Sequence, residues 1–482
     1  MFTSTANRRS PGALPLLGNG LVFLRPRQKL FGWFTECIQK YGQETLGIVI
    51  PILPPGVIIA NPVNLDFIFK HEELFKKGQF FRSRLQDLFG YGIVNVDGDL
   101  WRRQRAAGTH FFNGATMRTL KEIELPRALQ QAMSQLDQHA NIGTAVDLEA
   151  VLHELTTQLI GRLAYGVEMH AHDKFTKAFD HASFEIAKRF QNPLWRLTEL
   201  ITGGKLTESV RVIKRYGQEL VAQAVARRNG KYDERDLEER NAAPSLIDAL
   251  FDSLGRQELV ADSALNYLSA GKDTTAQALT WTFYLLILHQ GVAEKISRLV
   301  NSTESWSTQD SSCQSPRIQQ NLSSETTHFI LAVFYESLRL YPPIPFDMKQ
   351  AQNYTTLPDG TFIPKDSVVL WCTWAMNRSV KTWGEDAHIF RPDRWLEGGR
   401  IKQSSTGDFP VFQGGARLCL GKKMAELIAV QVIVALTRSF TFEQAFEGAK
   451  TSPTHLTLPM EDGLQVFIKH QCFERQREGT TV

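Results

Sequence analysis

The spacing of apolar residues along the chain predicts a protein built mainly from helices. In long segments they recur roughly every three to four positions, which places them on one face of a helix. One such segment begins directly after Gly421, where Met424, Leu427 and Ile428 share a face. Further helices are predicted over residues 62–77, 145–226, 259–289 and 328–340.

Two apolar runs near the N-terminus predict a β-hairpin instead. Residues 46–59 are rich in Ile and Val and are interrupted by Pro54-Pro55-Gly56, a turn sequence. Residues 79–95 form a mixed stretch with several Phe and Leu. Residues 227–240, with charges of both signs, and residues 301–327, rich in Ser, Thr and Gln, are expected to be surface loops. The fold class expected is therefore mainly α with small β-sheets.

Composition limits the size, partners and redox compartment of the protein. With 482 residues and 43% hydrophobic content, the chain can bury a large core, and its length alone would allow two or three domains. The formal net charge of +3 is too small to indicate nucleic-acid binding. The five cysteines are an odd set without paired spacing, which argues against a disulfide framework and suits a reducing compartment.

Residues 1–24 are expected to form a distinct N-terminal segment. Prolines and glycines interrupt the apolar residues that follow Arg8 and Arg9, so the segment is a poor signal peptide. The chain has no run of about eighteen or more apolar residues, so no membrane-spanning helix is predicted. Attachment to a membrane surface near Leu14, Leu16 and Leu17, or an anchor absent from this sequence, is the expectation instead.

The stretch from Phe412 to Gly421 contains the strongest candidate for chemistry. Cys419 lies in a glycine-rich loop just before a predicted helix, where the positive end of the helix dipole favours a thiolate. Gly415 and Gly421 allow backbone N–H groups and a large flat partner to approach closely. Arg417 offers a planar fork for a carboxylate, and Phe412 can shield the sulfur. A buried structural Cys is the alternative interpretation of Cys419 taken alone.

These residues fill every fixed position of Phe-x-x-Gly-x-Arg-x-Cys-x-Gly, and the stretch resembles the heme-binding signature of the cytochrome P450 family. The resemblance implies one heme b whose iron is ligated by Cys419. A thiolate ligand of this kind favours O–O cleavage. It also implies the family's fold, a single mainly α-helical domain, here residues 25–482, with small β-sheets. The resemblance also implies that Arg417 binds a heme propionate. The residues of the loop, besides Cys419, that would contact the heme are Phe412, Gly415, Arg417 and Gly421.

The middle of the helix predicted over residues 259–289 departs from the composition of a core helix. Gly, Asp and Thr are mediocre helix formers, yet Ala270-Gly-Lys-Asp-Thr-Thr275 places them where Leu or Ala would be preferred. A glycine there makes room for a small ligand, and a buried hydroxyl and carboxyl can deliver protons; alternatively, the Thr bonds back to its own helix. The segment is similar to the family's Ala-Gly-x-Asp-Thr-Thr motif. That similarity implies Gly271 beside the heme, with Thr274 and its acid partner Asp273 supporting oxygen activation.

A tryptophan and an arginine form a third motif. Trp101 and Arg105 lie one turn apart at the start of a predicted helix. Alone, this pair indicates a Trp packed under a surface Arg. The family uses Trp-x-x-x-Arg at this place to bind a heme propionate. The resemblance therefore implies that Trp101 and Arg105 bind a propionate here.

Glu336 and Arg339 form a fourth motif on the helix predicted over residues 328–340. At this spacing the two share a face and would ordinarily make a weak surface ion pair. In the family, Glu-x-x-Arg joins a downstream arginine in a buried network that holds the heme loop. The resemblance assigns that third position to Arg394.

The resemblance implies a monooxygenase that activates O2 and hydroxylates a C–H bond of a hydrophobic substrate, with NADPH electrons delivered by a flavin reductase. Residues 270–276, 357–360 and 383–387 resemble the branch that hydroxylates fatty acids and alkanes, and fungal enzymes that act on alkyl or polyketide chains in secondary metabolism. A long aliphatic chain is therefore the expected substrate. The apolar residues expected to line its pocket, several of which could equally be ordinary core, are Phe80, Phe81, Leu85, Leu88, Phe89, Ile344 and Phe346.

Two other functions are open alternatives: a heme-thiolate isomerase or dehydratase that needs no O2, and a heme sensor without turnover. Asp273 and Thr274 argue against the first, and a complete electron and proton path argues against the second. A monomer at the cytosolic face of the endoplasmic reticulum is expected, with a cytoplasmic location as the alternative. The cations expected to steer an acidic partner are Lys422, Lys423, Arg102 and Arg103.

Overall fold

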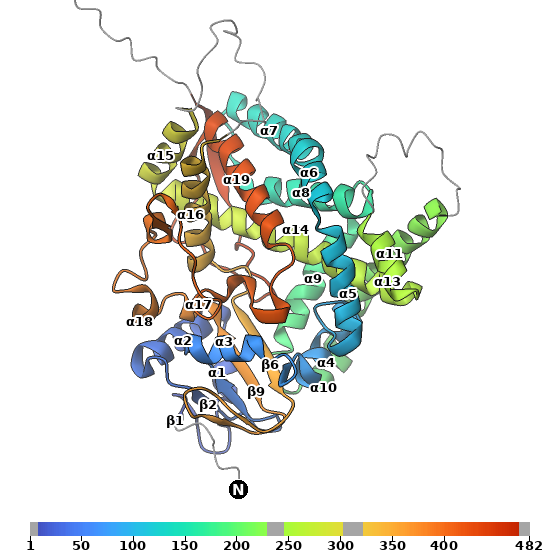
Figure 1. The fold of residues 1–482 in the computed structure, drawn as a ribbon, viewed down its shortest axis with the longest axis vertical. Helices are drawn as coiled ribbons and strands as arrows, with labels where there is room; N and C mark the ends of the chain where they lie inside the picture. Colours follow the sequence, from blue (N-terminus) through green and yellow to red (C-terminus); the bar gives the residue numbers. More distant parts are fainter. Residues whose placement is uncertain (1–7, 229–244, 302–321, 472–482) are drawn as a thin grey trace, which may run out of the picture.

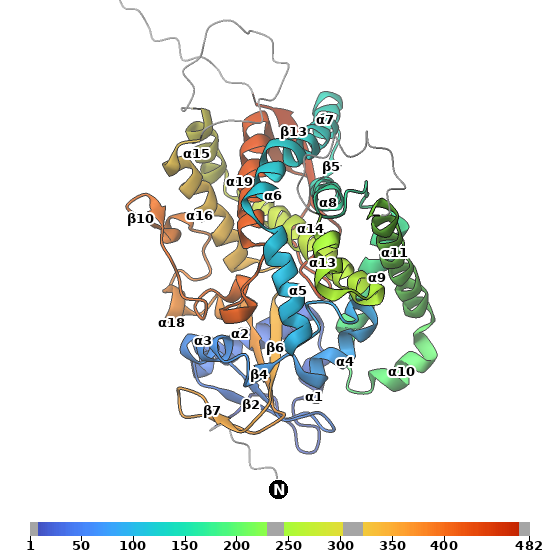
Figure 2. The ribbon, with the colours of Figure 1, turned by 45° about the vertical axis from the view of Figure 1, so that its right-hand side comes forward.

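Helices make up most of the structure, a computed structural model that describes residues 8–228, 245–301 and 322–471 (Figure 1). They surround one long helix, α14 (Gln257–Leu288), which crosses the middle of the molecule in both views (Figures 1 and 2). Small sheets complete the architecture, and the largest lies at the end of the molecule that contains β1 (Arg8–Arg9). The predicted mainly α fold with small sheets is confirmed.

The central helix α14 is buried on most of its faces, which explains the long apolar pattern that predicted it over residues 259–289. Gly271 lies against Ile160 of helix α8. A Cβ atom at position 271 would lie 3.0 Å from Ile160 Cδ1, which is too close for easy packing. The glycine therefore allows the two helices to pack closely. The helices in contact with α14 include α8 (Leu148–Ile160), α11 (Gly204–Arg228), α13 (Leu246–Leu254) and α16 (Ser324–Leu340).

The largest sheet has six strands in the order β1-β2-β3-β9-β6-β4. β2 (Leu46–Ile48) and β3 (Gly56–Ile58) pair in antiparallel fashion, which confirms the predicted hairpin. β9 (Val368–Cys372) then runs parallel to β3 and antiparallel to β6 (Phe346–Ala351). The sheet thus joins the N-terminal hairpin to a segment from the second half of the chain.

Two predicted helix boundaries were wrong, and one segment was left unassigned. The helical segment predicted over residues 145–226 begins instead with the strand β5 (Val146–Asp147), which pairs with the C-terminal strand β13 (Gln465–His470). Helix α3 (Pro62–Lys70) stops well before residue 77, because β4 (Phe75–Lys76) pairs with the end of β6. Pairing with so distant a strand leaves no periodic signal in the local sequence. The mixed stretch after residue 78 forms helix α4 (Gly78–Phe89), which contacts α9, α14 and β6.

The remaining elements complete the bundle and the smaller sheets. No described helix is both long enough and apolar enough to cross a bilayer. Most of the two predicted surface loops lies outside the described residues, and the proposed division at residue 24 stays a prediction. The other described α-helices are α1 (Gly20–Phe23), α2 (Arg27–Tyr41), α5 (Gly98–Phe111), α6 (Gly114–Thr119), α7 (Leu125–Ile142), α9 (Lys174–Lys188), α10 (Trp195–Thr202), α15 (Gln290–Asn301), α17 (Thr373–Met376), α18 (Val380–Trp383) and α19 (Lys422–Ser439). The other described strands are β7 (Thr355–Thr356), β8 (Phe362–Ile363), β10 (Leu396–Glu397), β11 (Arg400–Ile401) and β12 (Phe440–Gln444).

Candidate active site

The loop that contains Cys419 is fixed by its own backbone and by helix α3. The Cys419 N–H donates to the Phe412 carbonyl at 2.8 Å, which closes the loop just before α19. Gly415 has a φ of +57°, and a Cβ there would lie 2.0 Å from the Phe69 carbonyl oxygen. This glycine therefore seats the loop on α3, a role that the local sequence did not indicate.

The Cys419 thiol lies at the start of α19, as predicted. Burial raises its pKa above the ordinary value, while the N–H groups of Gly421 and Lys422 and the nearby Arg105 cation act in the opposite direction. Cys419 lies deep within the protein, but its side chain has accessible surface. That surface therefore faces a space inside the protein. A thiol that coordinates a metal ion is deprotonated and releases its proton to solvent, so ligation would hold Cys419 as a thiolate.

Arg417 is held by two carboxylates of the protein. Its guanidinium bonds Glu72 at 2.7 Å and Asp97 at 2.8 Å, and lies 4.2 Å from the centre of the Trp101 ring. Its predicted contact with a heme propionate stays a prediction. Glu72 and Asp97 were missed by sequence reasoning, because isolated carboxylates far from the loop give no motif.

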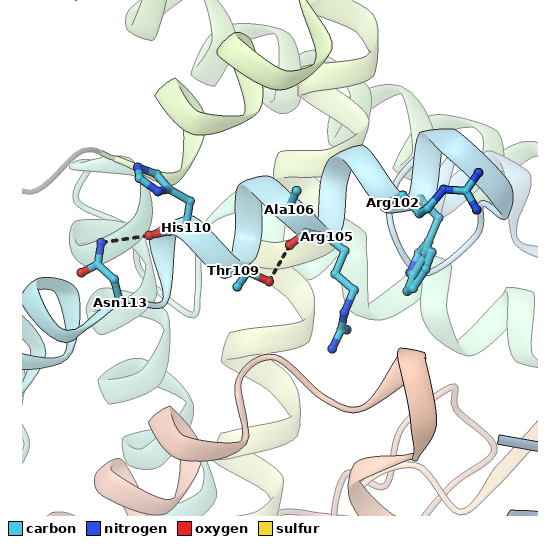
Figure 3. A pocket seen from close by; sticks show the side chains of 7 residues that line it. Arg102, Arg105, Ala106, Thr109, His110 and Asn113 are labelled. Atoms are coloured by element: carbon cyan, nitrogen blue, oxygen red, sulfur yellow. Dashed lines mark hydrogen bonds between the residues drawn. The ribbon is translucent and has the colours of Figure 1, made fainter. Parts of the chain in front are cut away.

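Arg105 points across a groove along α5 toward the loop that contains Cys419 (Figure 3). The groove has a volume of about 610 Å³ and is lined by Trp101 and Arg105 among others. Within the described residues, the Arg105 guanidinium has no hydrogen-bond acceptor or ion-pair partner, and burial lowers its pKa. An unpaired, partly buried guanidinium beside Cys419 is suited to an anionic group of a ligand.

Helix α5 also touches both the central helix and the cysteine loop at Gly108. A Cβ at Gly108 would lie 2.3 Å from Tyr267 Oη on α14 and 3.0 Å from Leu420 Cδ1 in the loop. The Tyr267 hydroxyl donates to the Gln104 carbonyl at 2.9 Å, which ties α14 to α5. Gly108 and Tyr267 thus bring the three elements of the site together, although neither belongs to a motif recognised in the sequence.

The middle of α14 has two different sides. On one side Ala270 is exposed and Thr274 half-buried, and the Thr274 hydroxyl donates to the Ala270 carbonyl at 2.6 Å. This is the back-bonding that the sequence left open as an alternative. On the other side Asp273 is buried and contacts the Lys272 ammonium. No hydrogen bond joins Thr274 to Asp273 in the described structure, so their cooperation stays a prediction.

The predicted network around Glu336 is present geometrically. Arg339 binds Glu336 through two bonds of 2.8 Å, and Arg394 Nε donates to the same carboxylate at 3.2 Å. Burial alone would raise the pKa of Glu336, but the bonds from Arg339 hold it below the ordinary value. The remaining N–H groups of Arg339 donate to the carbonyls of Asn377, Ala387 and Ile389.

The predicted pocket residues of α4 divide into core and boundary positions. Phe81, Leu85 and Leu88 are buried, whereas Phe80 and Phe89 are only half-buried. The Phe89 ring lies 6.2 Å from that of Phe179 on α9, so it faces the space between α4, α9 and α14. Of these five residues, Phe89 lies best for contact with a ligand beside α14.

The two predicted pocket residues after the Pro342-Pro343 turn have different surroundings. Phe346 stacks on Phe31 of α2, with ring centres 5.2 Å apart, and therefore packs into the N-terminal half. Ile344 is half-buried. Their contact with a substrate stays a prediction, and Ile344 is the better candidate of the two.

Comparison with known proteins decides the family. The cytochrome P450 family model matches residues 9–464. The chain belongs to the cytochrome P450 family. Cytochrome P450 704B1 of Arabidopsis thaliana is 27% identical, and the match covers 96% of this chain and 95% of that protein. Cytochrome P450 94A2 of Vicia sativa is 30% identical over 97% of this chain and 92% of its own length, and cytochrome P450 86B1 of Arabidopsis thaliana is 30% identical over 95% and 84%.

This P450 is therefore a monooxygenase, an enzyme class that uses heme iron, O2 and electrons from a redox partner on hydrophobic substrates. The residues of the site fit a heme: the Cys419 thiol faces an interior space, Arg105 is unpaired among the described residues, and one side of α14 is uncovered at Ala270. When bound, a thiolate-ligated heme supplies electron transfer and O–O cleavage. Of the two predicted propionate ligands, Arg105 is free to bind and Arg417 is already paired.

Proposed function

We propose that this P450 hydroxylates an aliphatic carbon of a long hydrophobic substrate, with heme b as cofactor and NADPH electrons delivered by a flavin reductase. The observation that carries the proposal is the meeting of the Cys419 loop, α5 and the uncovered side of α14 at Gly108 and Tyr267. Oxygen uptake with NADPH, reductase and a panel of fatty acids and alkyl polyketides tests it. A hydroxylated chain is expected, whereas heme spin-state shifts given only by compact aromatic or steroid ligands would overturn the choice of substrate.

Thr274 and Asp273 are the residues proposed to manage protons in this reaction. The Thr274 hydroxyl lies on the uncovered side of α14 and must rotate away from the Ala270 carbonyl to donate a proton there. Asp273 lies on the buried side, and its carboxyl group, once protonated, would return a proton to that hydroxyl. The protein's own contribution is therefore a proton path between two adjacent residues that lie on different sides of α14.

The proposed substrate pocket is apolar and is bounded by Phe89 on α4 and Ile344 after the Pro-Pro turn. Burial of chain methylenes against such residues is the main attraction available to an aliphatic substrate. Replacing Ile344 with Phe should shift the carbon that is hydroxylated or exclude longer chains, with an unchanged heme spectrum. The control is Ile401→Phe on β11, a half-buried site outside the proposed pocket. Unchanged product position in Ile344→Phe would remove this residue from the pocket.

The proposed docking site for the reductase is formed by the cations near the Cys419 loop and on α5. Arg102 and Lys423 are exposed, and the Asp99 carboxylate that lies 3.9 Å from Arg102 is exposed as well. Arg103 donates to the Ser253 carbonyl, and Lys422 lies 3.8 Å from the less exposed Glu426. Arg102 and Lys423 are therefore the cations best placed to attract an acidic partner. Arg102→Glu combined with Lys423→Glu should slow reduction by the reductase most strongly at low salt. A rate that does not change would refute this surface.

Attachment to the endoplasmic reticulum membrane is proposed through two apolar surfaces. Leu16 is 96% exposed, and on α10 Leu200 and Ile201 are 83% and 88% exposed. The segment that follows α1 and the segment that precedes α10 are in contact, because Gln191 donates to the Arg25 carbonyl at 3.1 Å. Leu200→Asp together with Ile201→Asp should reduce flotation with phospholipid vesicles. Equal recovery of wild type and variant in the soluble fraction would favour the cytoplasmic alternative.

A further inference from the structure

The buried side of α14 contains two charged residues, Lys272 and Asp273, and the proposed reaction uses only Asp273. Lys272 is 0% exposed, and its ammonium contacts Asp273 and lies 5.5 Å from the centre of the Phe179 ring. A buried ion pair in a core helix is expensive, because both ions lose their hydration. An apolar residue at Lys272 would avoid that cost, so the pair requires another explanation.

His153 on α8 connects this pair to a second buried carboxyl. Its Nδ1 atom lies 4.0 Å from Asp273 Oδ1, and its Nε2 atom lies 3.8 Å from Glu149 Oε1. Both distances exceed a direct hydrogen bond. However, 20% of the His153 side chain is exposed although the ring lies deep in the protein, so water can reach it and bridge to either carboxyl.

The ionisation states of these groups suit proton transfer. Burial raises the pKa of Glu149 to about 8, so this residue is a carboxylic acid at neutral pH. Burial lowers the pKa of His153 to about 4, so the imidazole is neutral and has one donor and one acceptor nitrogen. The other titratable groups that act on these residues from neighbouring elements are Asp147, Asp180, Lys272, Asp273, Lys450 and His455.

We propose that Glu149 and His153 form a proton path to Asp273, and that Lys272 is a positioning residue that holds the Asp273 carboxylate at its end. The Glu149 acid gives its proton to His153 Nε2, while the Nδ1–H of the same ring gives its proton to Asp273 Oδ1. The ring stays neutral, and the negative charge moves from Asp273 to Glu149. Solvent then reprotonates Glu149, whose side chain is 10% exposed. This path rests on the proposed role of Asp273 in oxygen activation.

The test uses the heme-loaded enzyme with its reductase and three variants: Glu149→Gln, His153→Gln and Asp273→Asn. Glu149→Gln is nearly isosteric and keeps the oxygen that accepts the Met460 N–H at 3.0 Å, so it carries the test even if His153→Gln folds poorly. The matched controls are Glu154→Gln on the same helix and His181→Gln on α9. A positioned proton donor contributes ~100-fold or more to the rate of a proton-transfer step. We expect a smaller effect on yield, a fall of about tenfold in product formed per NADPH in both path variants. The controls should retain the wild-type yield.

An infrared measurement on the substrate-free protein gives an independent readout. The carboxylic-acid band of Glu149 should be present at pH 7, disappear in Glu149→Gln, and titrate with a midpoint of about 8. Absence of that band, or wild-type yield in both path variants while Asp273→Asn loses product, would overturn the path and leave the role of Asp273 intact. Wild-type yield in Asp273→Asn would overturn that role and the path together.

Discussion

Two buried charge clusters lie on neighbouring helices of the core, and they are built differently. Around Glu336 on α16, Arg339 makes two short bonds, Arg394 adds a third, and the leftover donors of Arg339 bind backbone carbonyls. Around Lys272 on α14, one ammonium meets one carboxylate, and His153 stays 4.0 Å from that carboxylate. The charges at the centre of both clusters are buried, but the second cluster is loosely connected and water can reach it at His153.

The difference teaches which buried charges maintain a fold and which ones remain available for chemistry. A network whose donors and acceptors are all paired has no group available to exchange a proton. The Glu336 network instead holds α16 against the segment leading to the heme loop. A loosely connected cluster can exchange protons through water at small structural cost. We therefore expect damage to the first cluster to destroy the protein and damage to the second to alter its chemistry.

The largest effect is expected from Glu336→Ala. Removing the carboxylate leaves Arg339 buried without its partner, which should lower the free energy of unfolding by about 3–5 kcal/mol. Heme content and a urea unfolding curve measure the loss, which we expect to appear as aggregate or apoprotein. Glu443→Ala, which removes an exposed partner of Lys469, is the control and should change stability by less than about 1 kcal/mol. A soluble, heme-loaded and equally stable Glu336→Ala protein would refute the structural role of the network.

A smaller and purely chemical effect is expected from Thr274→Ala. Among the described residues the hydroxyl bonds only the Ala270 carbonyl of its own helix, so its loss should leave folding and heme content unchanged. Without a proton donor on the uncovered side of α14, NADPH should be wasted as peroxide, with product per NADPH reduced about tenfold. The control Thr282→Ala removes a hydroxyl with the same back-bond, to Ala278, farther along α14. Unchanged product yield in Thr274→Ala would return Thr274 to a helix-packing role.

The smallest effect is a pH dependence of stability at Glu149. Its pKa is about 8 in the folded protein and near 4.5 when unfolded, so the unfolded chain loses this proton first as pH rises. The stabilisation is complete below pH 4.5 and is lost as pH rises through about 8. Glu149→Gln should therefore gain stability relative to wild type between pH 5 and pH 8, by at least ~1 kcal/mol. A stability difference that stays constant over this range would contradict the buried acid.

The sequence predicted the parts of this molecule that repeat locally or form compact motifs. The pattern of α14, the β2–β3 hairpin and the spacing around Cys419 each lie within a short stretch of chain. Contacts between distant segments left no such signal. The end of α3 depends on the pairing of β4 with β6, and the partners of Arg417 come from separate loops. Likewise, Gly415 and Gly271 matched their motifs, but their neighbours Phe69 and Ile160 became visible only in the fold.

The central claim is that Cys419 binds heme iron through a thiolate. The most direct measurement is the carbon monoxide difference spectrum of the reduced wild-type protein, Cys419→Ser and Cys419→His, each with its heme content determined. We predict the red-shifted band of a thiolate-ligated heme in wild type and its loss in both variants, with Cys372→Ser behaving as wild type because that thiol is buried in β9. Survival of the band in both Cys419 variants would contradict the account.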